Sequence, residues 1–208
     1  DARDWPGLQE EVRVSTLALG GAALAQTGMA PCTDASGAPV AVTANQCLGR
    51  LQVTNRTGLN SVTSTFDTLY AFGGRSFSIW NASTGALVWD SGDQLERRLA
   101  ALYPQNFNAS HTANTLDGRS TSKGPEPEAI AVQRFGSKTF AFIGLERMGG
   151  VLVYDITNPA APTRVDYLNT RDEWLNDPET EATATPSRLA AIGDLGPEGL
   201  VFVPAAQS

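Results

Sequence analysis

The sequence predicts an all-β protein built from β-propeller blades. Three observations lead to this prediction: turn-forming residues spread along the whole chain, a hairpin pattern that occurs twice, and a Pro-Glu dipeptide that recurs at the spacing of the hairpins. The 20 glycines and 12 prolines do not gather in one tract, which is typical of many turns between short strands. With 208 residues, 41% of them hydrophobic, the chain has enough apolar material for a core.

The hairpin pattern lies in residues 69–80 and again in residues 140–154. Each copy reads as a strand, a glycine turn and a second strand that ends in an aromatic residue, and each is followed by another turn. We therefore expect a β-hairpin at both places.

The dipeptides Pro127-Glu128 and Pro197-Glu198 each precede an apolar strand and lie 70 residues apart, the offset that also relates the hairpins. The resulting order of turns and strands is that of a four-stranded propeller blade with insertions. This period gives about three blades, so we expect residues 1–208 to form part of a single β-propeller domain. Three blades cannot close a ring, so we also expect a longer natural polypeptide or other chains that cover the open sides.

A short surface helix and a polar loop are expected in residues 93–123. Asp93 and Glu96 have the spacing of a capping box, and Leu95, Leu99 and Leu102 fall on one helical face. Residues 169–193 are polar and predict a second long loop. Long loops of this kind are where such folds carry binding surfaces.

The two cysteines, Cys32 and Cys47, lie in a small, polar segment over residues 20–47 that has little periodicity. The chain has one histidine, too few to complete a metal site with them, so the sequence favours a disulfide that staples this loop. A disulfide indicates an oxidising compartment, and we expect a periplasmic or extracellular bacterial protein. Two unpaired buried cysteines in a cytosolic protein are the alternative.

The charge and hydropathy of the chain exclude two classes of partner. A net charge of −7 would repel a nucleic-acid backbone, and no run of lysine and arginine offsets it. The longest apolar stretch, Leu17 to Ala25, is too short to cross a bilayer, so we expect no transmembrane segment in residues 1–208. The expected partners are other protein chains or a surface polymer.

A candidate cation site is formed by the acidic residues near the Pro-Glu turns. Equivalent turns of successive blades would bring their carboxylates toward one end of a central channel, where oxygen ligands suit a hard cation such as Ca²⁺. The alternative is structural: a carboxylate that accepts backbone N–H hydrogen bonds where a strand begins. The candidate ligands are Asp117, Glu126, Glu128 and Glu198.

Catalytic chemistry has little support in the sequence. His111 is the single histidine, and no Gly-x-Ser-x-Gly motif accompanies it, so an exposed loop histidine is the better interpretation. We therefore expect a non-enzymatic binding or scaffolding module, an accessory subunit or surface protein of a larger assembly. The alternative hypothesis is a Ca²⁺-dependent phosphoesterase in which Arg119 or Lys123 contacts phosphate.

Several long, ordered motifs make the chain resemble the choice-of-anchor I family of secreted or surface-anchored bacterial propeller proteins, often labelled alkaline-phosphatase-like. The motifs are Asp1-Ala-Arg3 and the segments 73–80, 123–128, 142–150, 153–159 and 194–199. The resemblance covers nearly all of residues 1–208 and implies a β-propeller fold and export. The Asp/Gly-rich, calcium-like run that members often carry before the strand at Leu69 is reduced here to a single aspartate, Asp67.

Overall fold

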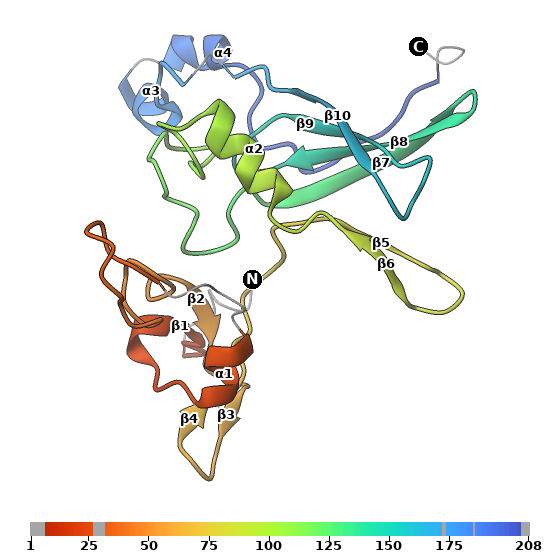
Figure 1. Cartoon of the computed structure of the whole chain (residues 1–208). Coiled ribbons are helices and arrows are strands. Elements are labelled where there is room, and N and C mark those ends of the chain that lie inside the picture. The colour runs from red at the N-terminus through yellow and green to blue at the C-terminus, as the bar shows by residue number, and fades with distance from the viewer. Residues whose placement is uncertain (1–6, 27–31, 172–173, 185, 205–208) are drawn as a thin grey trace. The chain divides into compact units, whose positions relative to one another are not determined.

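A computed structural model describes residues 7–26, 32–171, 174–184 and 186–204 of the chain. The chain divides into two compact units, residues 1–73 and residues 74–208. The described strands are antiparallel and form separate open sheets, and a few short helices lie between them (Figure 1). This part of the chain contains no helix that is both long enough and apolar enough to span a membrane.

The described part of the first unit consists of short strands, a helix and a 3₁₀ turn around a small core. β1 pairs with β2, and β3 pairs with β4. The core includes Val14, Val53 and Phe66, all buried. The elements are β1 (Glu11–Arg13), η2 (Val14–Thr16), α1 (Gly21–Gln26), β2 (Gln52–Thr54), β3 (Leu59–Asn60) and β4 (Thr65–Phe66).

The expected disulfide between Cys32 and Cys47 is present in the first unit, with the two Cα atoms 5.7 Å apart. The loop that it closes contains a turn at Asp34, whose carboxylate accepts hydrogen bonds from the backbone N–H groups of Ser36 and Ala38. The staple therefore closes a segment that also has local hydrogen bonds of its own.

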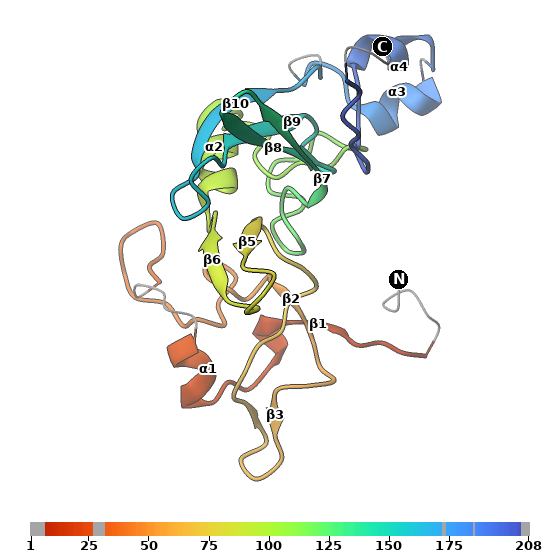
Figure 2. The same ribbon diagram turned by 90° about the vertical axis from the view of Figure 1, so that its right-hand side faces the viewer.

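The second unit contains a four-stranded antiparallel sheet in the order β10-β9-β8-β7 (Figures 1 and 2). Each strand pairs with the next in sequence, so the four strands form an antiparallel meander. The hairpin expected at residues 140–154 is confirmed as β8 and β9. The strands are β7 (Pro127–Phe135), β8 (Lys138–Leu145), β9 (Val151–Asp155) and β10 (Thr163–Leu168).

The turn between β8 and β9 requires glycine. Gly149 and Gly150 both have positive φ values, 79° and 76°. A Cβ atom on Gly150 would lie 2.5 Å from the carbonyl oxygen of Leu168, so a larger residue would push β9 away from the end of β10.

One face of this sheet packs against α2 (Gln94–Leu102) and the hairpin of β5 (Ser78–Trp80) and β6 (Leu87–Asp90). Leu95 and Leu99 of α2 are fully buried, as the helical spacing predicts, whereas Leu102 is partly exposed. On the same face, the rings of Phe77 and Tyr154 meet edge to face with centroids 4.9 Å apart.

The opposite face of the sheet carries the extended segment that ends the described chain. Phe202 of this segment contacts Phe135, with ring centroids 5.3 Å apart. A pocket of about 460 Å³ is lined by Leu200, Val201 and Phe202 of this segment and by sheet residues that include Phe142 and Val151. Val201 and Val203 are largely exposed. The segment therefore lies on the sheet without being hydrogen-bonded into it as a strand.

Besides α1, which lies at the start of the segment over residues 20–47 that we expected to be a loop, the structure corrects three local expectations. The hairpin expected over residues 69–80 is wrong. Residues 69–72 do not form a strand, although Ala71 makes an isolated β-bridge with Val53. β5 pairs with β6 instead. The expected capping box at Asp93 is wrong: its carboxylate bonds to Arg97, 2.7 Å away, and makes no capping hydrogen bond.

The third correction concerns residues 169–193, which are not only loop. They contain α3 (Pro178–Ala184), η3 (Pro186–Arg188) and α4 (Leu189–Ile192). Asp177 accepts a hydrogen bond from the Thr180 N–H, Pro178 occupies the first helical position and Glu179 follows it. These are signals for the start of a helix that the polarity of the segment obscured.

Candidate functional site

Two long segments, residues 106–126 and residues 169–196, meet in the second unit. We call their described residues the loop platform. Asn114 joins them: its backbone N–H donates to the Asp177 carboxylate at 2.7 Å, and its side-chain amide donates to the Trp174 carbonyl at 2.9 Å. The Glu179 N–H also donates to the Thr112 carbonyl, at 2.8 Å. The two segments therefore fix each other in place.

Arg171 is the second connection between the segments. Its guanidinium is buried, stacks 3.6 Å from the centre of the Trp174 ring, and donates to the Ser110 carbonyl and the Asn114 side chain. A planar cation with several donors can make the stacking and the hydrogen bonds at once. Trp174 in turn packs on Tyr103, which joins the platform to the end of α2.

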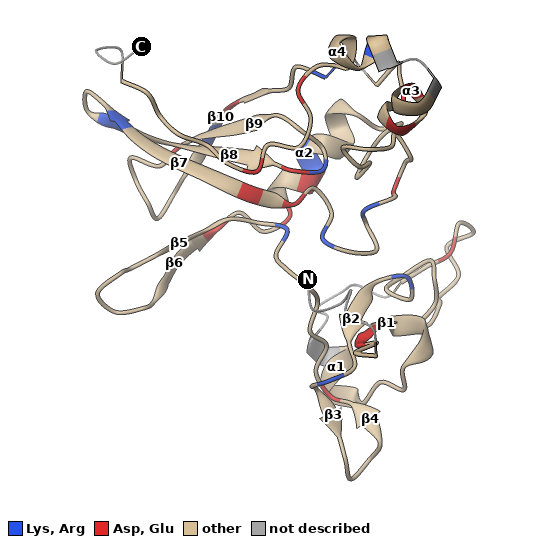
Figure 3. Ribbon diagram, turned by 180° about the vertical axis from the view of Figure 1, so that it is seen from behind, with Lys and Arg blue, Asp and Glu red and all other residues tan. Residues whose placement is uncertain are grey.

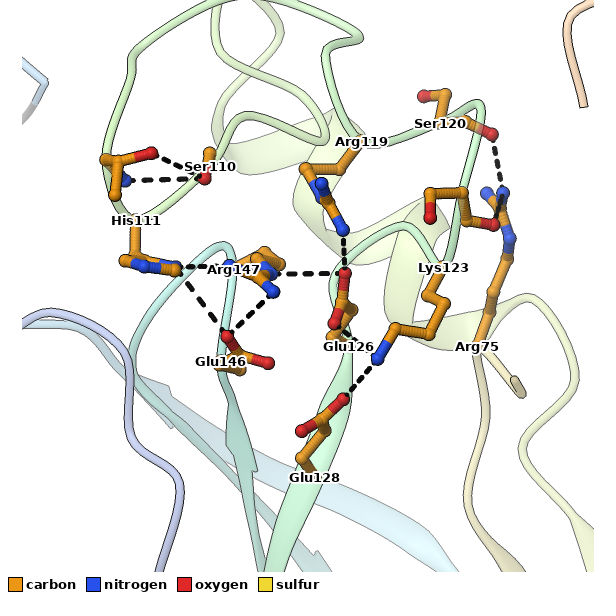
Figure 4. A network of polar contacts seen from close by, with 12 residues as sticks. Arg75, Ser110, His111, Arg119, Ser120, Lys123, Glu126, Glu128, Glu146 and Arg147 are labelled. Atoms are coloured by element: carbon orange, nitrogen blue, oxygen red, sulfur yellow. Dashed lines mark hydrogen bonds and ion pairs between the residues drawn. The ribbon is translucent and has the colours of Figure 1, made fainter. Parts of the chain in front are cut away.

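A cluster of paired charges lies where the first platform segment leads into β7 (Figures 3 and 4), and it joins that segment to β7 and the β8–β9 turn. Its centre is Glu126, whose carboxylate is fully buried. Arg119 contacts one oxygen of this carboxylate, Arg147 lies 3.1 Å from the same oxygen, and Lys123 lies 2.8 Å from the other. Glu126 has a φ of 53°, in the left-handed region, so the surrounding contacts hold its backbone in an uncommon conformation.

These three cations determine the charge state of Glu126. Burial alone would raise its pKa, but hydrogen bonds from Lys123 and Arg119, together with the charges of Arg119 and Arg147, lower the pKa to about 2. The same lysine lies 2.6 Å from Glu128, which is more exposed. Despite partial burial, the hydrogen bonds and charges of the two glutamates raise the pKa of Lys123.

Glu146 forms the other side of the cluster, 3.0 Å from Arg147 (Figure 4). Burial raises its pKa to about 7, and the charges of Glu126 and Glu128 add to this effect against the attraction of Arg147. The Glu146 backbone N–H donates to the Glu126 carbonyl at 2.8 Å, so the β8–β9 turn is bonded directly to the start of β7.

The expectation of an exposed loop histidine is wrong: His111 is partly buried beside Arg147 and is a neutral hydrogen-bond acceptor. Arg147 lies 2.9 Å from its Nδ1 atom, and because a guanidinium can only donate, Nδ1 accepts and the ring proton is on Nε2. Burial and the charges of Arg147, Arg119 and Arg171 lower the pKa of His111. Its 3.8 Å approach to Glu146 is therefore not an ion pair at neutral pH.

A third group of contacts attaches the platform to α2. Glu96 accepts from Arg75 at 2.8 Å and from the side-chain amide of Asn108 at 2.6 Å. Asn108 also donates to Ser120, and Arg75 donates to the carbonyl of Ser122. The first segment of the platform is thus tied to the helix by buried and half-buried polar groups.

A surface pocket of about 430 Å³ lies between the two segments of the platform. His111 and Thr112 come from the first segment and Glu179 from the second. The remaining lining residues are Pro178, Ala182, Thr183 and Leu195. The pocket combines small apolar groups with a few polar ones, a composition suited to binding.

The predicted ligand residues are partly brought together. Glu126 and Glu128 converge with Glu146, so that one carboxylate oxygen of each lies within 4.8 Å of the others. Asp117 and Glu198 are not in this group; Asp117 has a φ of 63° in the platform, and Glu198 is exposed in the extended segment. The cation site at these four residues stays a prediction.

The charge balance of the converging carboxylates bears on that prediction. Glu126, Glu128 and Glu146 are matched by Arg119, Lys123 and Arg147, all within ion-pair distance of at least one of them. Their charges are thus balanced by side-chain cations without a bound metal ion. These ion pairs are a structural role, but a different one from the backbone N–H hydrogen bonds considered from the sequence.

Sequence reasoning missed Glu146 and Arg147, which belong to the cluster, and Asn114 and Arg171, which join the platform. Glu146 and Arg147 directly precede Met148 and the two turn glycines, so their place in the β8–β9 turn was a usable signal. Asn114 and Arg171 carried no such signal, because their partners lie about 60 residues away.

The described residues define a mostly-β protein of open antiparallel sheets, with a loop platform joined to the largest sheet by a partly buried ion-pair cluster. The chain belongs to the choice-of-anchor I domain family, which it matches over residues 6–159. The match includes Glu126, Glu128 and Glu146 and ends before β10 and the second platform segment. It is shorter than the resemblance over residues 1–208 that the sequence motifs led us to expect.

Two animal proteins are similar to part of the chain. Gigasin-3a of Magallana gigas is 37% identical over 116 residues, which are 53% of this chain and 40% of that protein. A mesenchyme-specific cell surface glycoprotein of Strongylocentrotus purpuratus is 28% identical over 104 residues, which are 44% of this chain and 13% of that protein. The chain thus matches less than half the length of either relative. No solved structure matches it significantly.

Proposed function

We propose that this chain is a non-enzymatic binding or scaffolding module of a secreted or cell-surface protein, and that the loop platform is its binding surface. The family, the sea urchin relative named as a cell surface glycoprotein and the disulfide all support export. The proposal is for export in general, because both relatives are animal proteins; the periplasmic or extracellular bacterial location expected from the sequence stays a prediction.

The observation that carries the proposal is the mutual locking of the two long platform segments. Loops of this length are usually mobile unless they serve a function. Here, Asn114 and Arg171 connect them through five hydrogen bonds, and Arg171 stacks on Trp174. A surface that is rigid before binding loses less conformational entropy when a partner docks.

The ion-pair cluster supports the same proposal by serving as the base of the platform. Its cations and carboxylates are bonded to one another, and Glu126 and Glu146 also connect β7 to the β8–β9 turn through their backbones. A nucleophile or metal ligand needs a group that is available to substrate or ion. Glu126 is fully buried and paired three times, which favours a structural role.

The propeller architecture is a second part of the proposal. β7 to β10 have the topology of one blade, and residues 197–202 repeat the pattern of residues 127–132 at the start of β7. In a propeller the first strand of one blade packs on the face of the blade before it. The position of Leu200 and Phe202 against Phe142 supports this arrangement.

The proposal is tested by binding to the extracellular-surface fraction of the source cells, with the full chain as the probe. Thr112→Arg and Ala182→Arg place a bulky charge at exposed positions that line the pocket. Each should weaken binding at least tenfold without changing thermal unfolding. Ser137→Arg, in the exposed β7–β8 turn at the other end of the sheet, is the matched control and should bind like the unchanged chain.

Unchanged binding by both pocket variants would contradict the proposed surface.

The phosphoesterase hypothesis is tested separately, with p-nitrophenyl phosphate as substrate. Phosphate release that requires Ca²⁺, stops on chelation and is abolished by Glu128→Gln would establish that hypothesis and overturn the non-enzymatic proposal.

A further inference from the structure

The sequence contains three Asn-x-Ser/Thr triplets, the acceptor pattern for N-linked glycosylation. They begin at Asn55, Asn81 and Asn108. The pattern alone does not distinguish them, but the structure places the three side-chain amides in very different surroundings. A glycan needs an amide nitrogen that points to solvent and a backbone that tolerates a bulky substituent.

Asn108 is excluded by its contacts. Its residue is fully buried, and its amide nitrogen donates to Glu96 at 2.6 Å and to Ser120 at 2.9 Å. A sugar on this nitrogen would remove one of these hydrogen bonds and would have to occupy the space beneath the platform. A chain glycosylated at Asn108 could not adopt the described fold.

Asn55 is less suited because its amide is already in use. It lies just after β2, is partly buried, and donates from its amide nitrogen to the Gln9 carbonyl at 3.2 Å. The neighbouring Arg56 also contacts the same N-terminal segment, at Leu8. A glycan here would lie against the chain that pairs with β2.

Asn81 has the opposite arrangement. It directly follows β5, in the turn that connects β5 to β6. It is exposed, and its carbonyl oxygen Oδ1 accepts hydrogen bonds from the backbone N–H groups of Ser83 and Thr84, at 2.9 and 3.1 Å. Among the described residues its amide nitrogen has no recorded partner. The turn therefore depends on the oxygen, and the nitrogen can carry a substituent without breaking it.

The surface beside Asn81 provides a second, independent reason. Trp80 and Leu87 face each other across the hairpin and are 59% and 53% exposed. Exposed apolar groups of this size on a two-stranded hairpin favour association unless something covers them. A sugar attached to the adjacent residue would lie over this pair and shield it.

We propose that Asn81 is an N-glycosylation site and that its glycan covers Trp80 and Leu87. In this reaction the Asn81 amide nitrogen forms a bond to the anomeric carbon of an oligosaccharide carried on a lipid pyrophosphate. The bond from that carbon to the pyrophosphate oxygen breaks, the lipid pyrophosphate leaves, and the amide nitrogen loses one proton. The proposal rests on the export proposed above and on a eukaryotic source such as that of the two relatives, because in eukaryotes the transfer to Asn-x-Ser/Thr occurs in the secretory pathway.

The test is to produce the full chain behind a cleavable signal peptide in a eukaryotic secretory cell line. The disulfide-bonded chain is collected from the lumenal and the secreted pools, and its glycans are released enzymatically in ¹⁸O-water. Mass spectrometry then measures the fraction of each asparagine that carried a glycan. We expect Asn81 to be occupied in most molecules and Asn108 to be bare. Ser83→Ala should abolish the glycan at Asn81, and Thr57→Ala, in the Asn55 triplet, should leave it unchanged.

An Asn81 that is bare in the disulfide-bonded lumenal pool would overturn the proposal, as would occupied Asn108 in that pool. If Asn81 is occupied but the chain is not secreted, the result would count against the proposed export and not against the glycosylation site. The covering role has its own measurement: Ser83→Ala should increase self-association in sedimentation, and Ser83→Ala combined with Trp80→Ser should reverse the increase. Equal sedimentation of glycosylated and unglycosylated chains would contradict that role.

Discussion

Glu126 is a fully buried carboxylate that three cations contact, and its environment makes it sensitive to substitution. We predict that Glu126→Gln lowers the free energy of unfolding by about 3–5 kcal/mol, because it leaves Arg119, Lys123 and Arg147 without their central partner. Chemical denaturation at pH 7 measures the effect. Glu128→Gln is the matched control, and since Glu128 is partly exposed it should cost less than about 1 kcal/mol.

The lowered pKa of Glu126 also sets a pH window. The unfolded chain takes up a proton near pH 4.5, whereas the folded chain retains the carboxylate down to about pH 2. The ion pairs of Glu126 therefore contribute fully to stability above about pH 4.5, and this contribution is lost as the pH falls toward 2. Glu126→Gln should reduce the loss of stability between pH 4.5 and 2, and an unchanged acid limb would contradict the assignment.

Glu146 predicts the opposite slope at higher pH. Its pKa is raised to about 7, so from pH 4.5 upward the folded chain retains a proton that the unfolded chain has released. The stability that Glu146 contributes should therefore fall as the pH rises from 4.5 to 7. His111, whose pKa is lowered from 6.5 by burial and the neighbouring arginines, contributes the opposite slope in the acidic part of this range, so the effect is read from a comparison of two chains. Between pH 4.5 and 7, thermal unfolding of the unchanged chain should lose more stability, or gain less, than that of Glu146→Gln; identical slopes would contradict the raised pKa of Glu146.

At the level of elements, α2 holds the sheet of β7 to β10 through one face. Leu99 is fully buried among Ile143, Leu152 and other core residues, and Leu102 on the same helix is 37% exposed. We predict that Leu99→Ala costs about 2–5 kcal/mol because it leaves a cavity that the sheet cannot fill. The same truncation at Leu102 should cost much less. Denaturant titration compares the two, and equal losses would show that α2 is not packed as described.

The elements also show where local sequence patterns succeed. β7 to β9 and α2 were predictable because each depends on neighbours within a few residues: alternating apolar side chains, turn glycines and a helical spacing of leucines. α3 and α4 were missed because they are short and polar, although Asp177-Pro178 carried a start signal. The pairing of β5 with β6 was missed because the glycines at 73–74 were taken as the hairpin turn.

At the level of the whole molecule, the division at residue 73 predicts a local effect of the disulfide. Replacing Cys32 and Cys47 by serine should destabilise the first unit by roughly 3 kcal/mol, since the bond closes a loop of about 15 residues. Hydrogen exchange should then accelerate in β1 and β2 and stay unchanged in β7 to β10. Loss of protection in both units would instead show one cooperative domain, as the prediction of a single propeller domain implies.

The amino-acid sequence by itself determined the β-rich class, the β8–β9 hairpin, the helix after residue 93, the disulfide and the family. Each of these follows from residue types at short spacing or from one long motif pattern. Only the tertiary structure decided the roles of the charged and polar side chains. It paired Glu126 with Arg147 and left Asp117 and Glu198 outside the carboxylate group. It also exposed Asn81 and buried Asn108. The reason is physical: burial and charge pairing depend on which distant segments fold together, and no local pattern specifies that.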